Sequence, residues 1–515
     1  MKINNKAGRF ILVINQRKLG VILSYISMFL HIIIGFAYVP ILLSYLDKSQ
    51  YGLYQLMGSV IAYMSVMDFG LSGTITRYYS RYLALGDKKN QANILALSAL
   101  IYGSITILIL IAGVIVYFNL DSIFSKSLTV DELFKARQIF IIMLFNVAIT
   151  IPSHIFTAVI NANERFIFIR LLSIIQTLLQ PFVVIAIMLY KADVLGLVLV
   201  QTFFNLITII LKIYYSFNKL KIKIRLYFWD RPLLMEMLGF SFFIFLNMIV
   251  DQIYWKTDQV ILGIISGTSA VALYSFAAQL DSYYTNFSSI INDVFLPRIY
   301  AITAKTEDMS EINNIFNKVG RIKFFIMSLI LTGFILYGKD FIGFWAGEDF
   351  KPAYYMALIV MIPLLIPLIQ NTGIIILQAK NKHDFRAKVY VFIAILKIII
   401  SIPLAKFYGG IGCAIATAFS LIVGNVVIIN IYYHKEIEIN IIRFAKEILS
   451  MTLPVLIALT IGAMGNYYIE TASILSLGLK IITYTFVFVI LMWFMGLNDY
   501  EKGLFRGFLM KLKKR

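Results

Sequence analysis

Apolar stretches long enough to cross a membrane recur along the whole chain. About fourteen runs of roughly twenty hydrophobic residues follow one another, separated by short polar segments. Lipid offers no partner for unpaired backbone groups, so each run is expected to be a helix. The predicted spans lie at about 19–45, 51–74, 92–118, 136–160, 167–190, 194–216, 234–263, 271–296, 322–345, 353–379, 388–407, 411–433, 447–467 and 476–497.

The composition agrees with an all-α polytopic membrane protein. Hydrophobic residues make up 60% of the 515 positions and charged residues 14%. A soluble domain averages about 25% charged residues, and the spans leave no room for one. The first apolar run is long enough to remain as a span, so no cleavable signal peptide is expected. The one cysteine, Cys413, excludes disulfides and cysteine-based metal sites, and neither a metal nor a cofactor is expected.

Positive charges alternate between the two sides of the predicted bundle. Of the 46 Lys and Arg residues, about 35 fall in every second loop and in the two tails, and about eight in the loops between. Basic residues stay on the cytoplasmic side, so both termini are predicted to be cytoplasmic in a bacterial inner membrane. The net charge of +19 is spread over all the inner loops, which indicates anionic membrane lipids as partners and argues against nucleic acid.

An internal repeat runs at an offset of about 216–220 residues. Tyr51–Tyr54 opens one predicted span, and the similar segment Val271–Tyr274 opens the span six further on. Arg77 and Arg298 follow these segments at nearly equal distances. Two copies of six spans have the same orientation, which predicts a substrate site between two lobes. The predicted parts are an N-terminal lobe at 1–218, a cytoplasmic linker at 219–232, a second lobe at 233–434, and two further helices with a basic tail at 435–515.

Two six-helix lobes followed by two extra helices resemble the MOP superfamily of multidrug, oligosaccharidyl-lipid and polysaccharide exporters. Within it, the segments Tyr51–Tyr54, Asp68–Leu71 and Asp258–Ser275 resemble the Wzx-type polysaccharide flippases. This resemblance implies a transporter, not an enzyme, that moves undecaprenyl-diphosphate-linked oligosaccharide to the outer leaflet by alternating access. It also implies coupling to an H⁺ or Na⁺ gradient, and a glycan polymerase or chain-length regulator as a further partner.

Two other functions stay open at this point. A drug or small-molecule cation antiporter of the same superfamily should have a cavity dominated by acidic residues, whereas basic and acidic residues are mixed in these spans. A glycan polymerase or glycosyltransferase needs catalytic groups on a substantial outer loop, and the outer loops here are short. No GxxxxGK[ST] motif occurs in the chain, which argues against an ATP-driven pump.

Ionisable residues inside the predicted spans are candidates for function, because a charge at mid-bilayer costs ~2.5–3.5 kcal/mol and normally faces a cavity or a partner. Asn247, Asp251 and Asp258 share one face of their helix and suit a cavity wall. The alternative for Asp258 is a hydrated carboxylate near the outer end of the span. The candidates for ion coupling are Asp68, Asp251, Lys256, Asp258, Asp281 and Lys397.

A second set of residues is expected to contact the substrate. Arg77 and Arg298 occupy repeat-equivalent positions at inner helix ends, where two guanidinium groups could bind a diphosphate bidentately. The alternative is that they are ordinary positive-inside anchors. His31 and His154 are candidates for substrate contact, and His31 also for carrying a proton; packing is the alternative for both. Asn247 completes this set.

Overall fold

The structure is a computed structural model that describes residues 4–305, 309–380, 384–503 and 506. Side chains are described from residue 16 onward, apart from those of residues 240, 243, 293–294, 296–298, 300, 303–305, 379, 384 and 387. All the regular structure in these ranges is helical, as the sequence predicts. The chain divides into two compact units, Met1–Ala272 and Leu273–Arg515.

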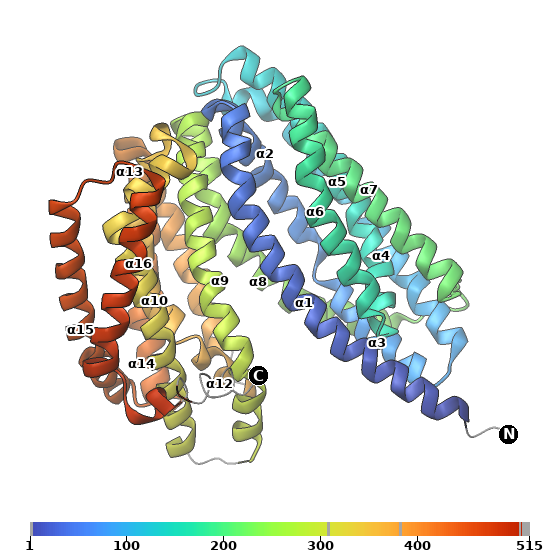
Figure 1. The fold of residues 1–515 in the computed structure, drawn as a ribbon. Coiled ribbons are helices and arrows are strands. Elements are labelled where there is room, and N and C mark those ends of the chain that lie inside the picture. Colours follow the sequence, from blue (N-terminus) through green and yellow to red (C-terminus); the bar gives the residue numbers. More distant parts are fainter. Residues whose placement is uncertain (1–3, 306–308, 381–383, 504–505, 507–515) are drawn as a thin grey trace. The chain divides into compact units, whose positions relative to one another are not determined.

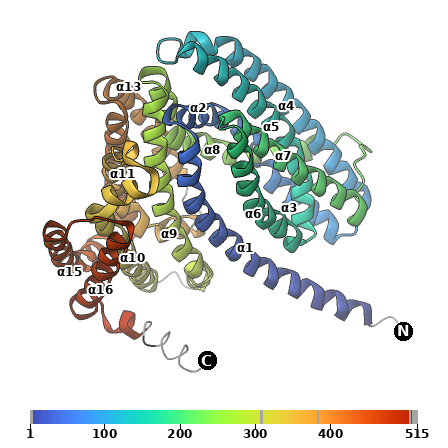
Figure 2. The same ribbon diagram turned by 45° about the horizontal axis from the view of Figure 1, so that its top comes forward.

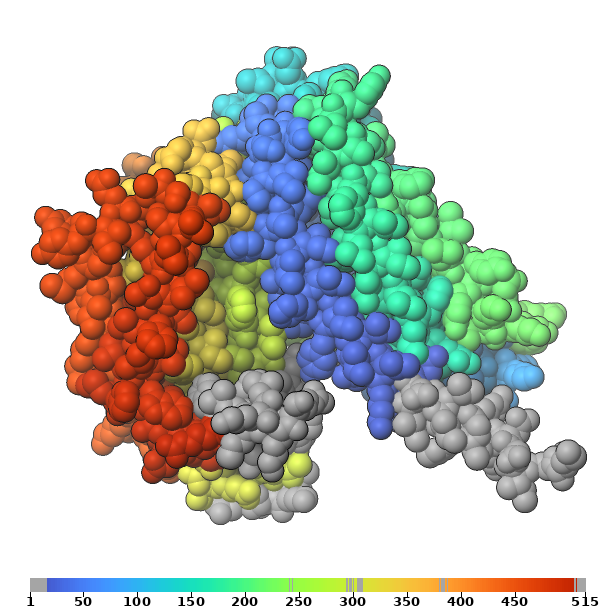
Figure 3. Space-filling model, viewed as in Figure 1, coloured from blue at the N-terminus to red at the C-terminus, as the bar shows by residue number. Residues whose placement is uncertain are grey.

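The first unit is built around α5, against which α2, α3, α4 and α7 pack, while α1 runs along α6 (Figure 1). Its long helices are α1 (Asn4–Tyr45), α2 (Lys48–Ser65), α3 (Leu71–Ala84), α4 (Lys88–Phe124), α5 (Val130–Ala162), α6 (Phe166–Tyr190), α7 (Val194–Tyr214) and α8 (Arg231–Ile265). Figure 3 shows α1 and α6 side by side on the surface of this unit.

Short polar side chains mark where several of these helices begin. Thr129 and Glu132 form a reciprocal capping box at the start of α5. Asp47 caps α2, and Asp87 caps α4 by accepting hydrogen bonds from the backbone N–H groups of Lys89 and Asn90. The hydrogen bonds from Asn90 hold the pKa of Asp87 below its usual value.

A break divides the predicted span 51–74 into two helices. The 3₁₀ turn η1 (Val66–Asp68) follows α2, and both Phe69 (φ 55°) and Gly70 (φ 63°) adopt the left-handed conformation before α3 begins. Glycine adopts this conformation at little cost, and its missing side chain leaves room for α8. A Cβ at Gly70 would lie 2.4 Å from a side-chain carbon of Ile244.

Helix α8 belongs to the first unit by its packing. Gly263 faces Leu56 of α2, and the Ser127 hydroxyl donates to the Gly263 carbonyl at 2.5 Å. The sequence repeat instead assigns this span to the second lobe. Packing and internal repetition are different criteria, so the repeat-based division at 219–232 stays a prediction.

The second unit packs α11, α15 and α16 around α10, with α13 against α11. Figure 2 shows α15 and α16 side by side within this unit. Its helices are α9 (Thr268–Lys305, which starts in the last residues of the first unit), α10 (Met309–Ala346), α11 (Ala353–Ile369), α12 (Thr372–Ala379), α13 (Asp384–Leu421), α14 (Ile429–Lys435), α15 (Ile441–Tyr468) and α16 (Ile474–Leu491).

Helix α13 and its continuation contain two predicted spans. A continuous helix over 388–435 has 48 residues, and at 1.5 Å per residue it would be about 70 Å long, more than twice the thickness of the hydrocarbon core. Gly409 interrupts it with non-helical angles (φ 57°, ψ −133°). A Cβ at Gly412 would lie 2.1 Å from the Leu404 carbonyl oxygen, so the chain folds back closely at this point.

Every predicted span coincides with a helix in the described residues. Eleven helices there are long and apolar enough to cross a membrane, or twelve if α11 and α12, bent by 48°, form one broken span. The 388–435 helix counts once among them although it holds two predicted spans, and α9, along which polar residues recur, is not among them. The all-α polytopic architecture is therefore confirmed.

Candidate functional site

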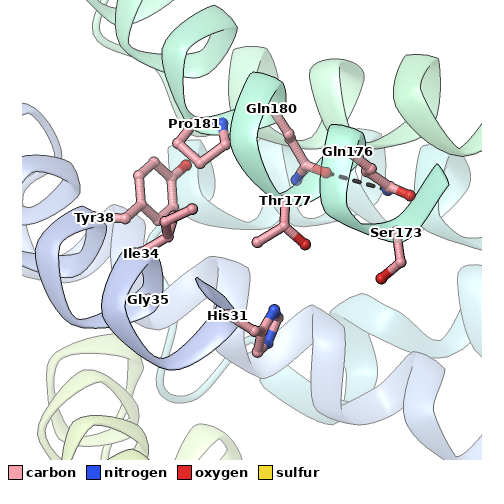
Figure 4. Close-up of a pocket in the computed structure, with 9 residues that line it drawn as sticks. All are labelled: His31, Ile34, Gly35, Tyr38, Ser173, Gln176, Thr177, Gln180 and Pro181. Carbon is pink, nitrogen blue, oxygen red and sulfur yellow. Dashed lines mark hydrogen bonds between the residues drawn. The ribbon is translucent and has the colours of Figure 1, made fainter. Parts of the chain in front are cut away.

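A cavity of about 380 Å³ lies between α1 and α6 of the first unit. Helix α1 contributes His31 and Tyr38, the latter with a buried hydroxyl that has no hydrogen-bond partner in the described residues. In Figure 4, Ser173 and Thr177 of α6 point towards α1, where His31 lies. The full lining is His31, Ile34, Gly35, Tyr38, Ser173, Gln176, Thr177, Gln180 and Pro181.

The polar side of this cavity follows from the spacing of four residues along α6. Ser173, Gln176, Thr177 and Gln180 stand at i, i+3, i+4 and i+7, which places them on one face of a helix. Between them lie apolar residues such as Leu179, which is half exposed on the outer surface. Helix α6 therefore turns hydroxyl and amide groups inward and aliphatic groups outward.

Hydrogen bonds fix part of this polar face. Gln176 donates to Gln180 at 3.3 Å and accepts from Thr208 of α7 at 3.2 Å. The Ser27 and Ser173 hydroxyls lie 3.3 Å apart across α1 and α6. None of the nine lining residues is an Asp, Glu, Lys or Arg, so apart from the imidazole of His31 the polar groups of the cavity are uncharged, and the rest of its lining is apolar.

A second uncharged polar cluster connects α5 and α7. Asn205 donates to Thr150 at 2.7 Å and also to the side-chain oxygen of Asn146. Asn146 in turn lies 3.4 Å from the Thr202 hydroxyl. Unpaired amides are costly in a membrane, and the side chains of these four residues, one turn each of α5 and α7, satisfy one another.

The structure brings together two candidates that were predicted separately, Asp68 and His154. The Nδ1 atom of His154 on α5 lies 2.8 Å from a carboxylate oxygen of Asp68 in η1. The Asp68 side chain is 11% exposed and that of His154 32%. The pair therefore sits at the α2–α3 break, largely enclosed but open on the imidazole side.

The predicted polar face of α8 splits into two environments. Asn247 and Asp251 are exposed, Lys256 is half-buried and Asp258 is fully buried. A hydrated Asp258 is thereby excluded. Its neighbours on α8 bond to α2, because Gln259 accepts from Ser59, and the Thr257 and Tyr63 hydroxyls form a short hydrogen bond.

In the second unit, Asp281 on α9 and Lys397 on α13 are both buried. One carboxylate oxygen of Asp281 has no hydrogen-bond partner in the described residues. Tyr284 and Ser288, which lie on the same face of α9, donate to the carbonyls of Met327 and Leu368 in α10 and α11. Asp281 therefore faces the interior of the second unit.

The structure describes the side chain of only one of the two predicted diphosphate ligands. Arg77 lies on the exposed surface of α3, with its guanidinium 5.6 Å from the centre of the Tyr78 ring. Arg298 lies in α9, and its side chain is outside the described residues. Whether they act together stays a prediction.

Arg321 and Lys323, at the start of the predicted span 322–345, are both buried in α10. Lys323 donates to Asn292 of α9 at 2.9 Å. Arg321 pairs with Glu501, which follows α16. The polar face of α6 was not predicted, although its four polar residues recur at helical spacing in the sequence.

No three His, Cys, Asp or Glu side chains within the described ranges are grouped as metal ligands would be. The described helices define an all-α polytopic membrane protein, and two solved structures share its fold. The solved structure of the lipid II flippase MurJ in an inward closed conformation matches 92% of this chain and 98% of its own, with a TM-score of 0.73 at 16% identity. An inward-facing MATE family multidrug resistance transporter matches 79% of this chain and 96% of its own, with a TM-score of 0.64 at 13% identity.

The family follows from residues 18–303, which match the sequence profile described as polysaccharide biosynthesis protein. The chain belongs to this family. A putative O-antigen transporter of Shigella flexneri is 20% identical over 385 residues, which is 73% of this chain and 88% of the relative. The probable low-salt glycan biosynthesis flippase Agl15 of Haloferax volcanii is 24% identical over 194 residues, which is 37% of this chain and 40% of the relative. The chain thus spans less than half of that second relative.

Proposed function

We propose that this protein flips a polyprenyl-diphosphate-linked oligosaccharide from the inner to the outer leaflet of a bacterial inner membrane. The observation that carries the proposal is the cavity between α1 and α6 with its row of uncharged polar side chains, in a chain of the polysaccharide biosynthesis family. The relatives named as flippases or O-antigen transporters support the same function.

The cavity chemistry suits sugars. A glycan presents many hydroxyl groups that donate and accept hydrogen bonds, and the amides of Gln176 and Gln180 and the hydroxyls of Ser173 and Thr177 can do both. A volume of about 380 Å³ is within the usual range for small-ligand pockets, ~300–1,000 Å³. We infer that this cavity holds part of the glycan while it crosses the membrane.

A cation antiporter is the second candidate, and the cavity disfavours it. An organic cation needs a carboxylate or an aromatic cage in its site, because its charge must be compensated in low dielectric. The nine lining residues include no Asp or Glu and only one aromatic ring with a π-face beside the histidine, that of Tyr38.

Further parts of the proposal concern the lipid diphosphate, the coupling ion and the orientation of the chain in the membrane. Arg77, together with Arg298, is proposed to bind the lipid diphosphate, since a guanidinium fork matches phosphate oxygens bidentately. An ion gradient is proposed to drive transport, with H⁺ or Na⁺ as the coupling ion. The candidates for coupling are the intramembrane charges Asp68, Asp251, Lys256, Asp258, Asp281 and Lys397. Both termini are proposed to be cytoplasmic, with anionic lipids around the basic loops and a glycan polymerase as a downstream partner.

The cavity is tested by removing hydroxyl or amide groups without changing side-chain size. Thr177→Val and Gln176→Leu each delete one hydrogen-bonding group, and an ordinary hydrogen bond contributes about 0.5–1.5 kcal/mol, so transport should fall about two- to tenfold. Surface polysaccharide and undelivered lipid-linked oligosaccharide are measured in cells that depend on this protein.

The matched control is Thr452→Val, whose hydroxyl donates only to the Ile448 carbonyl of its own helix α15. This variant should transport normally. If Thr177→Val and Gln176→Leu at wild-type abundance transport as well as Thr452→Val, the cavity does not hold the glycan.

A further inference from the structure

We propose that the Asp68–His154 pair is a proton-binding site and that the coupling ion of this transporter is H⁺. The inference rests on the proposed function for its role in transport, but the binding of the proton itself does not. It starts from the 2.8 Å contact between the imidazole Nδ1 and the carboxylate, which joins two helices that are far apart in the sequence.

The pair has the access that a proton site needs. The Asp68 carboxylate is nearly enclosed, whereas about a third of the His154 side chain is exposed, so the imidazole is the side of the pair that a proton can reach. Imidazole changes its charge between about pH 5 and 8, the range in which cells maintain proton gradients. A packing histidine would be satisfied on both nitrogens and closed to water.

The charge balance favours binding one proton. With a neutral imidazole the pair carries one negative charge, which is costly in a low-dielectric membrane interior. A proton taken from water onto the open nitrogen gives an imidazolium beside a carboxylate, and the pair becomes neutral. Returning that proton to water on the other side restores the first state, and no covalent bond is made or broken.

Tyr102 of α4 is a titratable neighbour of the pair. Its hydroxyl is buried and lies beside the Asp68 carboxylate, to which it can donate a hydrogen bond. On α2 the Tyr63 hydroxyl bonds instead to Thr257 of α8.

The remaining contacts are apolar or uncharged. Helix α8 meets the break through Ser241, Ile244 and Phe245, none of which titrates. On α3, Tyr78 lies beside Glu236 of α8 and Tyr79 beside Asn163, so both face partners other than His154.

The Asp68–His154 pair lies beside the break between α2 and α3, against which α8 packs. Asp68 ends the 3₁₀ turn, and the next two residues hold the left-handed break against that helix. Phe69 stacks on Phe245 with ring centres 4.1 Å apart, and Gly70 lies directly under Ile244. A left-handed Phe is strained, so this backbone is held by its surroundings and responds to a change in them. Proton binding at Asp68–His154 is thereby linked to the position of α8.

The first test needs no transport substrate. Purified full-length protein with ¹⁵N-labelled histidine has four imidazoles, and the signal missing from His154→Asn identifies His154. We expect the chemical shift of that signal to respond to pH and the response to differ in Asp68→Asn. The control Asp121→Asn removes a half-exposed carboxylate that pairs with Arg137 and should leave the response unchanged. A His154 signal that does not respond to pH, or that responds alike in wild type and Asp68→Asn, overturns the proposal.

The second test measures coupling in proteoliposomes that contain lipid-linked oligosaccharide. A gradient of one pH unit is expected to drive accumulation about tenfold for each proton exchanged, and an equal Na⁺ gradient to have no effect. Asp68→Asn and His154→Asn should lose this stimulation. Wild-type exchange that ignores the pH gradient contradicts the proton site, whereas absence of any exchange in wild type contradicts the proposed function and leaves the histidine titration to decide the site.

Discussion

The guanidinium of Arg321 forms a bidentate ion pair with the carboxylate of Glu501, at 2.6 Å from Nε and 3.0 Å from Nη2. Both side chains are buried, at 7% and 2% exposure. Arg321 also donates to the backbone carbonyls of Glu447 and Gly496. One side chain of α10 thus fastens the segment after α16 and the start of α15, the two helices that lie outside the predicted repeat.

We predict that Arg321→Lys lowers the stability of the second unit strongly. Lysine keeps the charge but cannot make four donor contacts in one plane, and leaving a buried hydrogen-bonding partner unsatisfied costs about 1–3 kcal/mol. Thermal unfolding in detergent measures the effect. The control is Arg443→Lys, since the Arg443–Glu447 pair is largely exposed and should contribute about 0–1 kcal/mol. Equal unfolding temperatures for the two variants would show that the buried pair is dispensable.

A second prediction concerns the closest helix approach in the first unit. A Cβ at Gly52 of α2 would lie 1.9 Å from the Thr268 carbonyl oxygen, a backbone atom that cannot move aside alone. Gly52→Ala should therefore separate α2 from the α8–α9 connection and lower the abundance of folded protein.

The same substitution at Gly58, on the same helix, provides the control. A Cβ there meets nothing within 4 Å, and alanine favours a helix over glycine by about 0.5–1 kcal/mol. Gly58→Ala should be neutral or stabilising. The close-approach argument fails if both variants accumulate and unfold alike.

Most of the fold could be predicted from the sequence, because a lipid environment requires apolar helices of a fixed length. Breaks were harder to foresee. Gly409 divides a long apolar run as expected, but the break at Phe69–Gly70 depends on α8 lying against it. Contacts between distant helices are set by three-dimensional packing, which one sequence does not display.

The candidate site could be predicted only in part, because its contacts also join helices that are distant in the sequence. Asp68 and His154 each stood out as ionisable residues in a span, but nothing in their spacing indicates that they touch. Ser173, Gln176, Thr177 and Gln180 form a clear helical stripe, which a search for uncharged polar residues would have found. The burial of Arg321 could not be predicted, because an arginine at the end of a predicted span usually lies at the membrane surface.

The predicted orientation is tested by thiol labelling. Ser122 and Ser310 are both exposed, and the alternation of basic loops places them on opposite sides of the membrane. Cysteines at these positions, in a Cys413→Ser background, should react with an impermeant reagent from outside at Ser122 and only after lysis at Ser310. Cys413 is buried, so the unmodified chain should show little labelling. Labelling of both positions from outside would contradict the topology.

The diphosphate proposal predicts a specific effect of Arg77→Lys. Loss of a charge-assisted bidentate contact, at about 1.5–3 kcal/mol, should reduce transport about ten- to a hundredfold at normal abundance. Arg81→Lys, at an exposed residue one turn further along α3, is the control and should transport normally. Equal transport by the two variants would make Arg77 a membrane anchor only.

The most direct measurement is flipping by the purified protein in proteoliposomes that contain a fluorescent polyprenyl-diphosphate-linked oligosaccharide. A membrane-impermeant glycosidase added outside reports how much glycan faces outward. If the protein flips this lipid, the glycan of the inner-leaflet fraction becomes accessible to the glycosidase with wild-type protein. We expect this to be about two- to tenfold slower with Thr177→Val and to proceed at the wild-type rate with Thr452→Val. Accessibility no greater than in protein-free vesicles, together with uptake of an organic cation by the same preparation, would contradict it and identify an antiporter instead.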